Sequence, residues 1–282
     1  MSLFRAFALL LLPIPLLLPI LAHAALPQAA SVPGGIALIP LRAVSSEAPR
    51  PRAWLGEQRI LVAADGRQWY AVVGLSLDLP AGSHELRVST GDTTESVHFR
   101  VSPKHYPEQR IRLKDGSKVQ LSPADEARAE REIATIQALK RHWRETDDTD
   151  PDFSLPAEGR LAGRFGLRRF FNGEARAPHA GLDLALARGT PIKASAQGRV
   201  LAADDYFFNG KTIFVDHGNG LITMYCHLDQ TDVVVGDHVA KGQRLGLSGS
   251  TGRATGPHLH WSVVLNGAMV DPELFVRAKR LR

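Results

Sequence analysis

Two histidines, His258 and His260, stand one residue apart in the segment GPHLHWSVV near the end of the 282-residue chain. The apolar residues around them favour a strand, and side chains two apart on a strand point to the same face. Two imidazoles on one face are suited to binding a metal ion or moving a proton. An isolated pair of this kind is at least as typical of an exposed polar face, so the other histidines must decide.

A second candidate is the pair His179 and Asp183 in PHAGLDLAL. Residues four apart share a face on a helix, and they also share one on a strand because four is even. Gly181 and the alternation that follows it favour a strand. The helical zinc motif HExxH is absent from the sequence.

A third candidate is His227 in the segment MYCHL, within a strand-like run. Strict alternation places Tyr225 on the face of His227 and Cys226 on the opposite face. We therefore interpret Cys226, the single cysteine of the chain, as a small core residue rather than a zinc ligand or a nucleophile. His217 and His238 fall in segments typical of turns and are not counted as ligands.

These residues together have the composition of a catalytic zinc site. Such a site uses three protein ligands and leaves one position open, and two histidines with one carboxylate suffice. Zinc lowers the pKa of its bound water toward 7 and polarises a carbonyl group. Two histidines then remain for proton transfer, which suits peptide hydrolysis without a glutamate base.

The motifs HAGLD, YCHL and GPHLHW, in this order, resemble those of the LytM/lysostaphin-type zinc metallopeptidases, the M23 family. The similarity runs from about residue 159 to 275 and includes GRFGLR, KTIFVDHGNGL and GDHVAKGQRLGLSGSTGRATG. The resemblance implies that His179, Asp183 and His260 bind one zinc ion. It implies that His227 and His258 form the catalytic pair beside the zinc-bound water.

The elements that must position these residues follow from the hydrophobic pattern. Short strands separated by turn signals over residues 32–121 predict an immunoglobulin-like β-sandwich, and this part resembles the β-domain of secreted Gram-negative members. Residues 122–154 predict a linking amphipathic helix and an acidic linker, with Ser122 as N-cap and a stripe of Ile133, Ile136, Leu139 and Trp143. Residues 155–282 predict an antiparallel β peptidase domain, so the fold is mainly β.

Residues 1–24 have the pattern of a signal peptide, with one basic residue, an apolar run and an Ala-His-Ala cleavage motif. We therefore expect export to the periplasm, and contact with a membrane only if this segment stays uncleaved. The net charge of +5 is carried by scattered residues, and no nucleic-acid-binding motif is present. We expect a monomer with no nucleic-acid partner.

The resemblance implies a zinc endopeptidase that hydrolyses the peptide cross-links of peptidoglycan and binds its stem peptides. The alternative is a catalytically inactive relative that activates cell-wall amidases. Inactive relatives lack metal ligands, whereas all five positions are present here. A lipoyl or biotinyl carrier is disfavoured, because the segment GDHVAKGQRLG lacks the exposed lysine hairpin with its neighbouring methionine.

Overall fold

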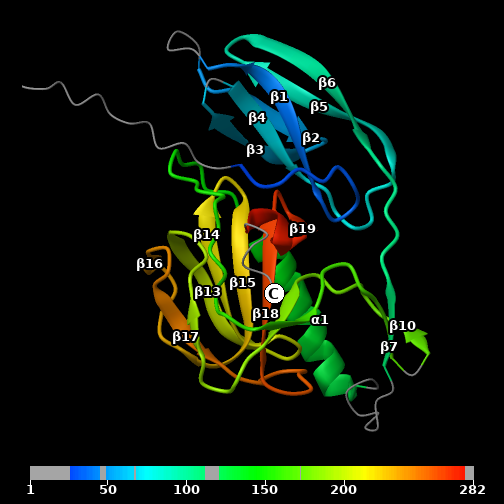
Figure 1. The fold of residues 1–282 in the computed structure, drawn as a ribbon, viewed down its shortest axis with the longest axis vertical. Coiled ribbons are helices and arrows are strands. Elements are labelled where there is room, and N and C mark those ends of the chain that lie inside the picture. The colour runs from blue at the N-terminus through cyan, green and yellow to red at the C-terminus, as the bar shows by residue number, and fades with distance from the viewer. Residues whose placement is uncertain (1–25, 45–48, 67, 112–120, 172, 277–282) are drawn as a thin grey trace, which may run out of the picture.

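The computed structural model describes residues 26–44, 49–66, 68–111, 121–171 and 173–276, and they form two β-rich modules stacked end to end (Figure 1). The predicted signal peptide at residues 1–24 lies outside the described residues. Across the described ranges, no helix is both long and apolar enough to cross a membrane. The prediction of a mainly β fold with a helix after the first module is confirmed.

Six antiparallel strands build the N-terminal module around an apolar core. They follow one path in the order β1-β4-β3-β2-β5-β6. The halves of this path share β3, which pairs with β2 through its first residues and with β4 through its last. The strands are β1 Ile36–Ala43, β2 Arg52–Leu55, β3 Gln58–Asp65, β4 Gln68–Gly74, β5 Gly82–Thr90 and β6 Thr93–Val101.

A ten-stranded antiparallel sheet forms the C-terminal module. Its main path runs β16-β13-β14-β15-β18-β11-β8, with β12, β17 and β19 attached beside it. The path strands are β8 Arg160–Gly163, β11 Leu182–Ala185, β13 Gly198–Tyr206, β14 Gly210–Gly218, β15 Leu221–Thr231, β16 His238–Val239 and β18 His258–Leu265. The attached strands are β12 Pro191–Lys193, β17 Arg244–Ser248 and β19 Ala268–Val270, and the 3-10 helix η1 Pro272–Phe275 follows.

The two modules share one apolar core at the C-terminal end of β18. Ile36, Leu61 and Val72 of the first module belong to the same buried cluster as Leu265. Gly74 approaches Leu265 so closely that a Cβ atom built there would lie 2.3 Å from the Leu265 carbonyl oxygen. Because His258 lies at the opposite end of β18, the first module packs on the end of the sheet remote from the histidines.

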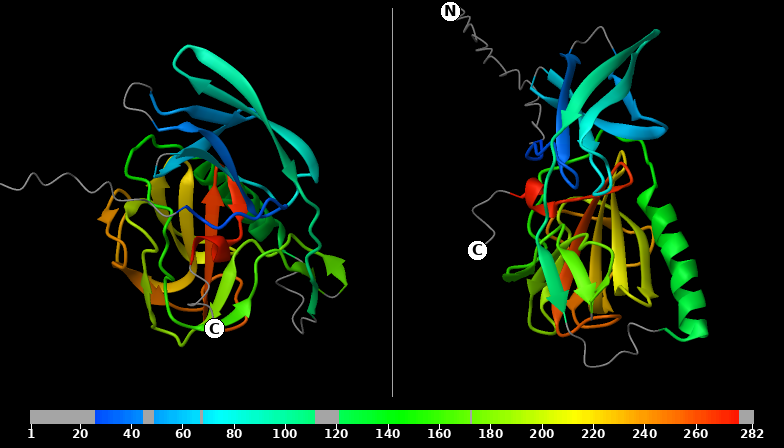
Figure 2. Two further views of the ribbon diagram at one scale, coloured as in Figure 1. Left: turned by 45° about the horizontal axis from the view of Figure 1, so that its top comes forward. Right: turned by 90° about the vertical axis from the view of Figure 1, so that its right-hand side faces the viewer.

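The helix α1, Pro123–Lys140, packs along the second module (Figure 2, right). Ser122 is its N-cap, as predicted, and accepts a hydrogen bond from the Asp125 backbone at 3.2 Å. The predicted apolar stripe is wrong at both ends. Ile133 is 48% exposed, and Trp143 lies beyond the last helical turn, while Ile136 and Leu139 do pack against the sheet.

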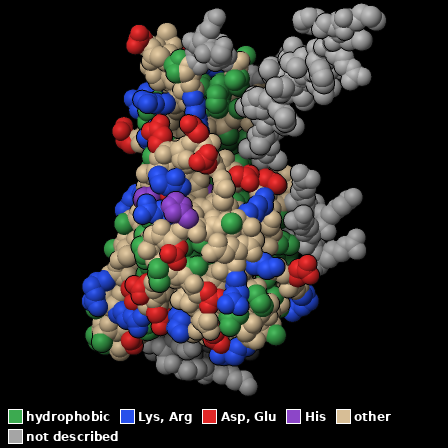
Figure 3. Space-filling model, turned by 90° about the vertical axis from the view of Figure 1, so that its left-hand side faces the viewer, with side chains coloured by type: hydrophobic (Ala, Val, Ile, Leu, Met, Phe, Trp, Pro, Cys, Tyr) green, Lys and Arg blue, Asp and Glu red, His purple; other side chains and the backbone are tan. Residues whose placement is uncertain are grey.

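A small three-stranded sheet, β10-β9-β7, lies beside the second module. It consists of β7 Glu108–Ile111, β9 Arg168–Phe171 and β10 Glu174–Ala175, with β7 parallel to β9. β7 lies in the stretch assigned to the first module from the sequence, yet it pairs with a strand of the second. The surface elsewhere carries acidic and basic side chains intermixed, as one face shows (Figure 3).

Candidate metal centre

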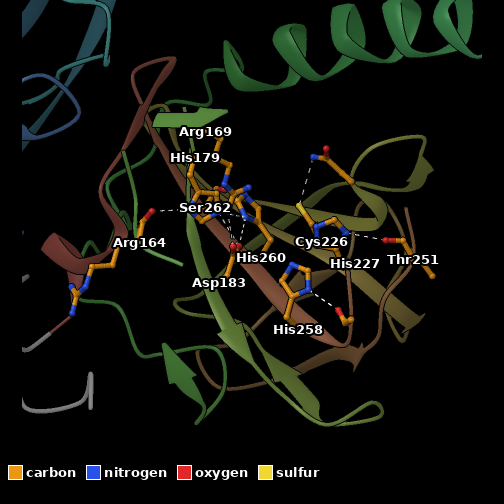
Figure 4. A network of polar contacts seen from close by, with 12 residues as sticks. Arg164, Arg169, His179, Asp183, Cys226, His227, Thr251, His258, His260 and Ser262 are labelled. Atoms are coloured by element: carbon orange, nitrogen blue, oxygen red, sulfur yellow. Dashed lines mark hydrogen bonds and ion pairs between the residues drawn. The ribbon is translucent and has the colours of Figure 1, made fainter. Parts of the chain in front are cut away.

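Three of the predicted site residues converge on one point. Nε2 of His179 lies 2.9 Å from Oδ1 of Asp183 and 3.0 Å from Nδ1 of His260. Nδ1 of His260 lies 2.8 Å from the same carboxylate oxygen. The potential ligand atoms of the three residues all lie within 4.8 Å of one another, and Figure 4 shows them meeting between two strands.

Strand register explains this convergence. Asp183 of β11 and His260 of β18 are directly paired across the antiparallel ladder, so their side chains emerge from the same face at close range. Their chain neighbours Leu182, Leu184 and Leu259 point to the other face and are buried in the main core. The core residues therefore fix which face carries the polar groups.

Each member of the cluster is held by a further partner. Nδ1 of His179 lies 2.7 Å from the carbonyl oxygen of Arg164, and because a carbonyl only accepts, this nitrogen carries the hydrogen and Nε2 presents its lone pair. Nε2 of His260 lies 2.9 Å from Oγ of Ser262. Oδ2 of Asp183 accepts a hydrogen bond from Arg169 at 3.0 Å. Such partners orient metal ligands and select their tautomers.

The local electrostatics favour an ionised Asp183 beside a neutral His260. Burial alone raises the pKa of Asp183, but its close polar contacts with His179 and His260 outweigh burial and hold the pKa well below its usual range. Burial lowers the pKa of His260, although hydrogen bonding to Asp183 opposes the change. An ionised carboxylate and neutral imidazoles are the protonation states that bind a cation.

Two glycines keep the space around the ligands open. A Cβ atom at Gly181 would lie 2.6 Å from Oγ of Ser262 and 2.7 Å from Cε1 of His260. A Cβ atom at Gly163 would lie 2.5 Å from Oδ2 of Asp183. Real Cβ atoms do not approach other atoms so closely, so both positions require glycine for the ligands to keep these places.

His227 and His258 lie beside the cluster without joining it (Figure 4). Their ring centroids are 4.7 Å apart, and the ring of His227 lies 6.1 Å from that of His260. Nδ1 of His227 donates to the Thr251 carbonyl at 2.9 Å, and Nδ1 of His258 donates to the Gly256 carbonyl at 2.8 Å. Each ring in its neutral form therefore carries its lone pair on Nε2.

A β-bulge sets the direction of His227. Between Ile213↔Tyr225 and Lys211↔Leu228, β15 contains one more residue than β14, and His227 has a φ of 63°. A bulge of this kind re-aims a side chain. Burial, followed by the neighbouring His260, lowers the pKa of His227 to about 4, so the ring is neutral at neutral pH.

The bulge also overturns one prediction. Tyr225 does not share the face of His227, because Tyr225 is buried in the main core, whereas His227 faces the metal cluster. Cys226 is buried, as predicted, in a separate cluster with Phe214 and Met224. Burial raises the pKa of its thiol to about 12, which makes Cys226 a packing residue rather than a reactive group.

Other residues singled out in the sequence have structural contacts. His217 lies in β14 rather than in the turn, buried between the Gln197 carbonyl at 2.6 Å and Oγ1 of Thr223 at 2.8 Å. The two arginines of the GRFGLR segment are also paired, Arg164 with Glu273 and Arg168 with Glu108. The supporting roles of Ser262 and Arg169 were missed. Alternation along β18 places Ser262 on the face of His260 and was a usable signal, whereas no spacing rule connects Arg169 to Asp183.

Comparison with known proteins places this arrangement in a family. The family models of the peptidase family M23 and of the M23 N-terminal domain match residues 177–272 and 29–104. The crystal structure of a Pseudomonas aeruginosa protein named as a peptidase M23 is 40% identical. It aligns over 87% of this chain and 95% of that one, with a TM-score of 0.74. The chain belongs to peptidase family M23.

Two curated relatives align over a shorter part of the chain. The peptidoglycan DD-endopeptidase ShyA of Vibrio cholerae is 38% identical over 120 residues, which are 42% of this chain and 28% of that protein. The DD-carboxypeptidase/endopeptidase Mpg of Neisseria meningitidis is 40% identical over 94 residues, 33% of this chain and 22% of that protein. The chain thus matches about a quarter of the length of these curated relatives.

Proposed function

We propose that this protein is a zinc-dependent endopeptidase that hydrolyses peptide cross-links of bacterial peptidoglycan, acting in the periplasm after export. The observation that carries the proposal is the convergence of His179, Asp183 and His260 beside two further histidines, His227 and His258. Membership in the M23 family supports a peptidase. The names of the ShyA and Mpg relatives support peptidoglycan as the substrate.

The residues present fit a zinc ion. Two imidazole nitrogens and one carboxylate oxygen, 2.8–3.0 Å from one another, form the three-ligand set of a catalytic zinc site. His179 would bind through Nε2, His260 through Nδ1 and Asp183 through Oδ1. When bound there, zinc supplies a Lewis acid that polarises a carbonyl group and lowers the pKa of a water molecule.

The remaining histidines supply the proton chemistry. The lone pairs on Nε2 of His227 and His258 are positioned to accept a proton from the attacking water and to return it to the leaving amine. Once protonated, either ring also stabilises the negative charge that develops on the former carbonyl oxygen. Thr251 and Gly256 hold the two rings through their carbonyl groups, so little reorientation is needed during the reaction.

The test combines metal content with product analysis. Purified protein should contain one zinc ion per chain by elemental analysis, and it should release muropeptides from purified sacculi that mass spectrometry identifies by the cleaved bond. A chelator should abolish this release, and added zinc should restore it. Full activity in zinc-free protein would overturn the metal assignment. A zinc-loaded protein that cleaves no sacculus would favour the alternative, a relative that activates amidases.

A further inference from the structure

The loop of residues 249–257, here called the histidine loop, orients both catalytic histidines and carries an arginine between the two contact points. The Thr251 carbonyl accepts from His227, and the Gly256 carbonyl accepts from His258. Arg253 stands two residues after Thr251 and three before Gly256. Its backbone is therefore fixed within a few residues of the groups proposed to carry out the reaction (Figure 4 labels Thr251).

Arg253 is held in place by the neighbouring β13–β14 turn. Its backbone N–H donates to the Phe208 carbonyl at 2.9 Å, and the central carbon of its guanidinium lies 4.1 Å from the centroid of the Phe208 ring. Stacking of this kind orients a guanidinium while leaving its N–H edge available. The side chain remains exposed, so a ligand can reach that edge.

The neighbouring arginines have acidic partners, whereas Arg253 has none among the described residues. Arg169 pairs with Asp183, and Arg176 pairs with Glu174. Within the described ranges Arg253 forms no ion pair. Although the residue as a whole is exposed, partial desolvation of the guanidinium lowers the pKa of Arg253, and the nearby Arg176 and Arg169 lower it further. An anion bound at this position would neutralise the charge of this guanidinium.

We propose that Arg253 is a specificity residue that binds a free carboxylate of the peptide substrate next to the cleaved bond. A guanidinium fixed on an aromatic ring matches a carboxylate through two parallel hydrogen bonds. Stem peptides offer this group at a peptide C-terminus or on a diamino acid. The proposal rests on the proposed peptidoglycan function and specifies how that substrate is recognised.

The first arm of the test measures cleavage of a soluble cross-linked muropeptide dimer by zinc-loaded protein. Three forms of the dimer are compared. The first has all its carboxylates free, the second has its C-terminal carboxylate amidated, and the third has its diamino-acid carboxylate amidated. For wild type, amidation of the recognised carboxylate should lower kcat/KM about ten- to a hundred-fold, as expected for a charge-assisted hydrogen bond. The amidated form that loses activity identifies which carboxylate is bound.

The second arm uses variants. In Arg253→Gln, kcat/KM on the dimer with free carboxylates should fall by the same factor. Amidation of the recognised carboxylate should cause no further fall in this variant, and the variant should keep its zinc. Arg253→Lys, which keeps charge without the planar fork, should fall between them. Arg199→Gln serves as the matched control, because Arg199 of β13 is exposed and its side chain contacts the Gly236 carbonyl. This variant should cleave the dimer as wild type does. The proposal would be overturned if R253Q lost the same factor in kcat/KM on the free and the amidated dimers. It would also be overturned if wild type cleaved the free dimer and both amidated dimers equally well.

A third arm separates this inference from the proposed function. Calorimetric binding of a single stem peptide to the zinc-loaded protein requires no cleavage. Affinity should drop about tenfold when the recognised carboxylate is amidated, and this difference should disappear in R253Q. If the dimer is not cleaved but the binding difference is found, the endopeptidase function fails while the carboxylate site stands. If the dimer is cleaved and the difference is absent in both arms, the carboxylate site fails alone.

Discussion

The imidazole rings of His227 and His258 lie 4.7 Å apart, and both rings are held through Nδ1 by carbonyl groups of one loop. Neither ring takes part in the His179–Asp183–His260 cluster. The five polar residues thus divide into a group with converging ligand atoms and a pair with free Nε2 atoms. This division separates the expected effects of substitution.

Substituting the histidines should separate metal binding from catalysis. His258→Ala should keep zinc and lose at least a hundredfold in activity on sacculi, because it removes a proton acceptor and no ligand. His260→Ala should lose both zinc and activity, because two ligands remain. Elemental analysis and muropeptide release check both variants. The reverse pattern, with zinc lost in H258A and kept in H260A, would mean that the roles are exchanged.

Gly181→Ala should disrupt the metal centre through crowding. The added methyl group would overlap Oγ of Ser262 and Cε1 of His260, so the ligand must move. Zinc affinity, measured by competition with a chromogenic chelator, should fall by at least tenfold. Gly189→Ala is the control, since a Cβ there meets nothing within 4 Å but the residue has a φ of 82°. It should cost about 1 kcal/mol of stability and keep its zinc affinity.

Ser262→Ala tests the support of a ligand from outside the cluster. The hydroxyl group lies 2.9 Å from Nε2 of His260, and without it the ring loses the partner that orients it. Loss of such a partner typically reduces metal affinity 10- to 100-fold. The same chelator competition measures the change, with Ser89→Ala on β5 of the first module as control. Unchanged zinc affinity in S262A would contradict this role.

The structure brings His179, Asp183 and His260 together, and their role as zinc ligands stays a prediction. Asp183 and His260 could be placed from the sequence because both lie on regular strands, β11 and β18, whereas His179 precedes β11. Alternation placed His258 and His260 on one face, and it placed Asp183 opposite its apolar neighbours. It failed at Tyr225, because a bulge inserts one residue and His227 adopts a positive φ. A local irregularity of this kind has no signal in residue spacing, since histidine rarely adopts that conformation. Of the partners of these residues, Ser262 lies two residues after His260 on β18, so alternation alone could have found it. Arg169 comes from β9 of the separate three-stranded sheet, and no spacing in the sequence connects it to Asp183.

The helix and the first module show the same limit. Capping chemistry at Ser122 is local, so its prediction was correct. The apolar stripe failed because its members were chosen by spacing alone. Trp143 instead lies beyond the helix, with the guanidinium of Arg59 4.5 Å from its ring. Likewise, pairing of β7 with β9 depends on contacts between distant parts of the chain, which composition and turn signals do not encode.

Substitution of Gly74 tests how the two modules are joined. Its N–H donates to Oδ1 of Asn266 at 3.3 Å, and its Cα lies against the Leu265 backbone. Gly74→Ala should force the modules apart and lower the free energy of unfolding by about 1–3 kcal/mol, the usual range for overpacking. Chemical denaturation measures this loss. Gly56→Ala, where a Cβ meets nothing within 4 Å although φ is 58°, should cost only about 1 kcal/mol.

The buried His217 should make stability depend on pH. Burial lowers its pKa to about 4 in the folded protein, whereas the unfolded value is about 6.5. Between these values the unfolded chain binds a proton that the folded chain does not, so stability rises with pH and is lost as pH falls from about 6.5 to 4. The loss approaches about 3 kcal/mol. His217→Gln can keep both hydrogen bonds without titrating, so its thermal stability, measured in zinc-free protein, should decline less over this range. His227 is lowered to a similar pKa and contributes to both proteins, so the difference between them isolates His217. Parallel pH profiles for the two proteins would show that His217 does not titrate as inferred.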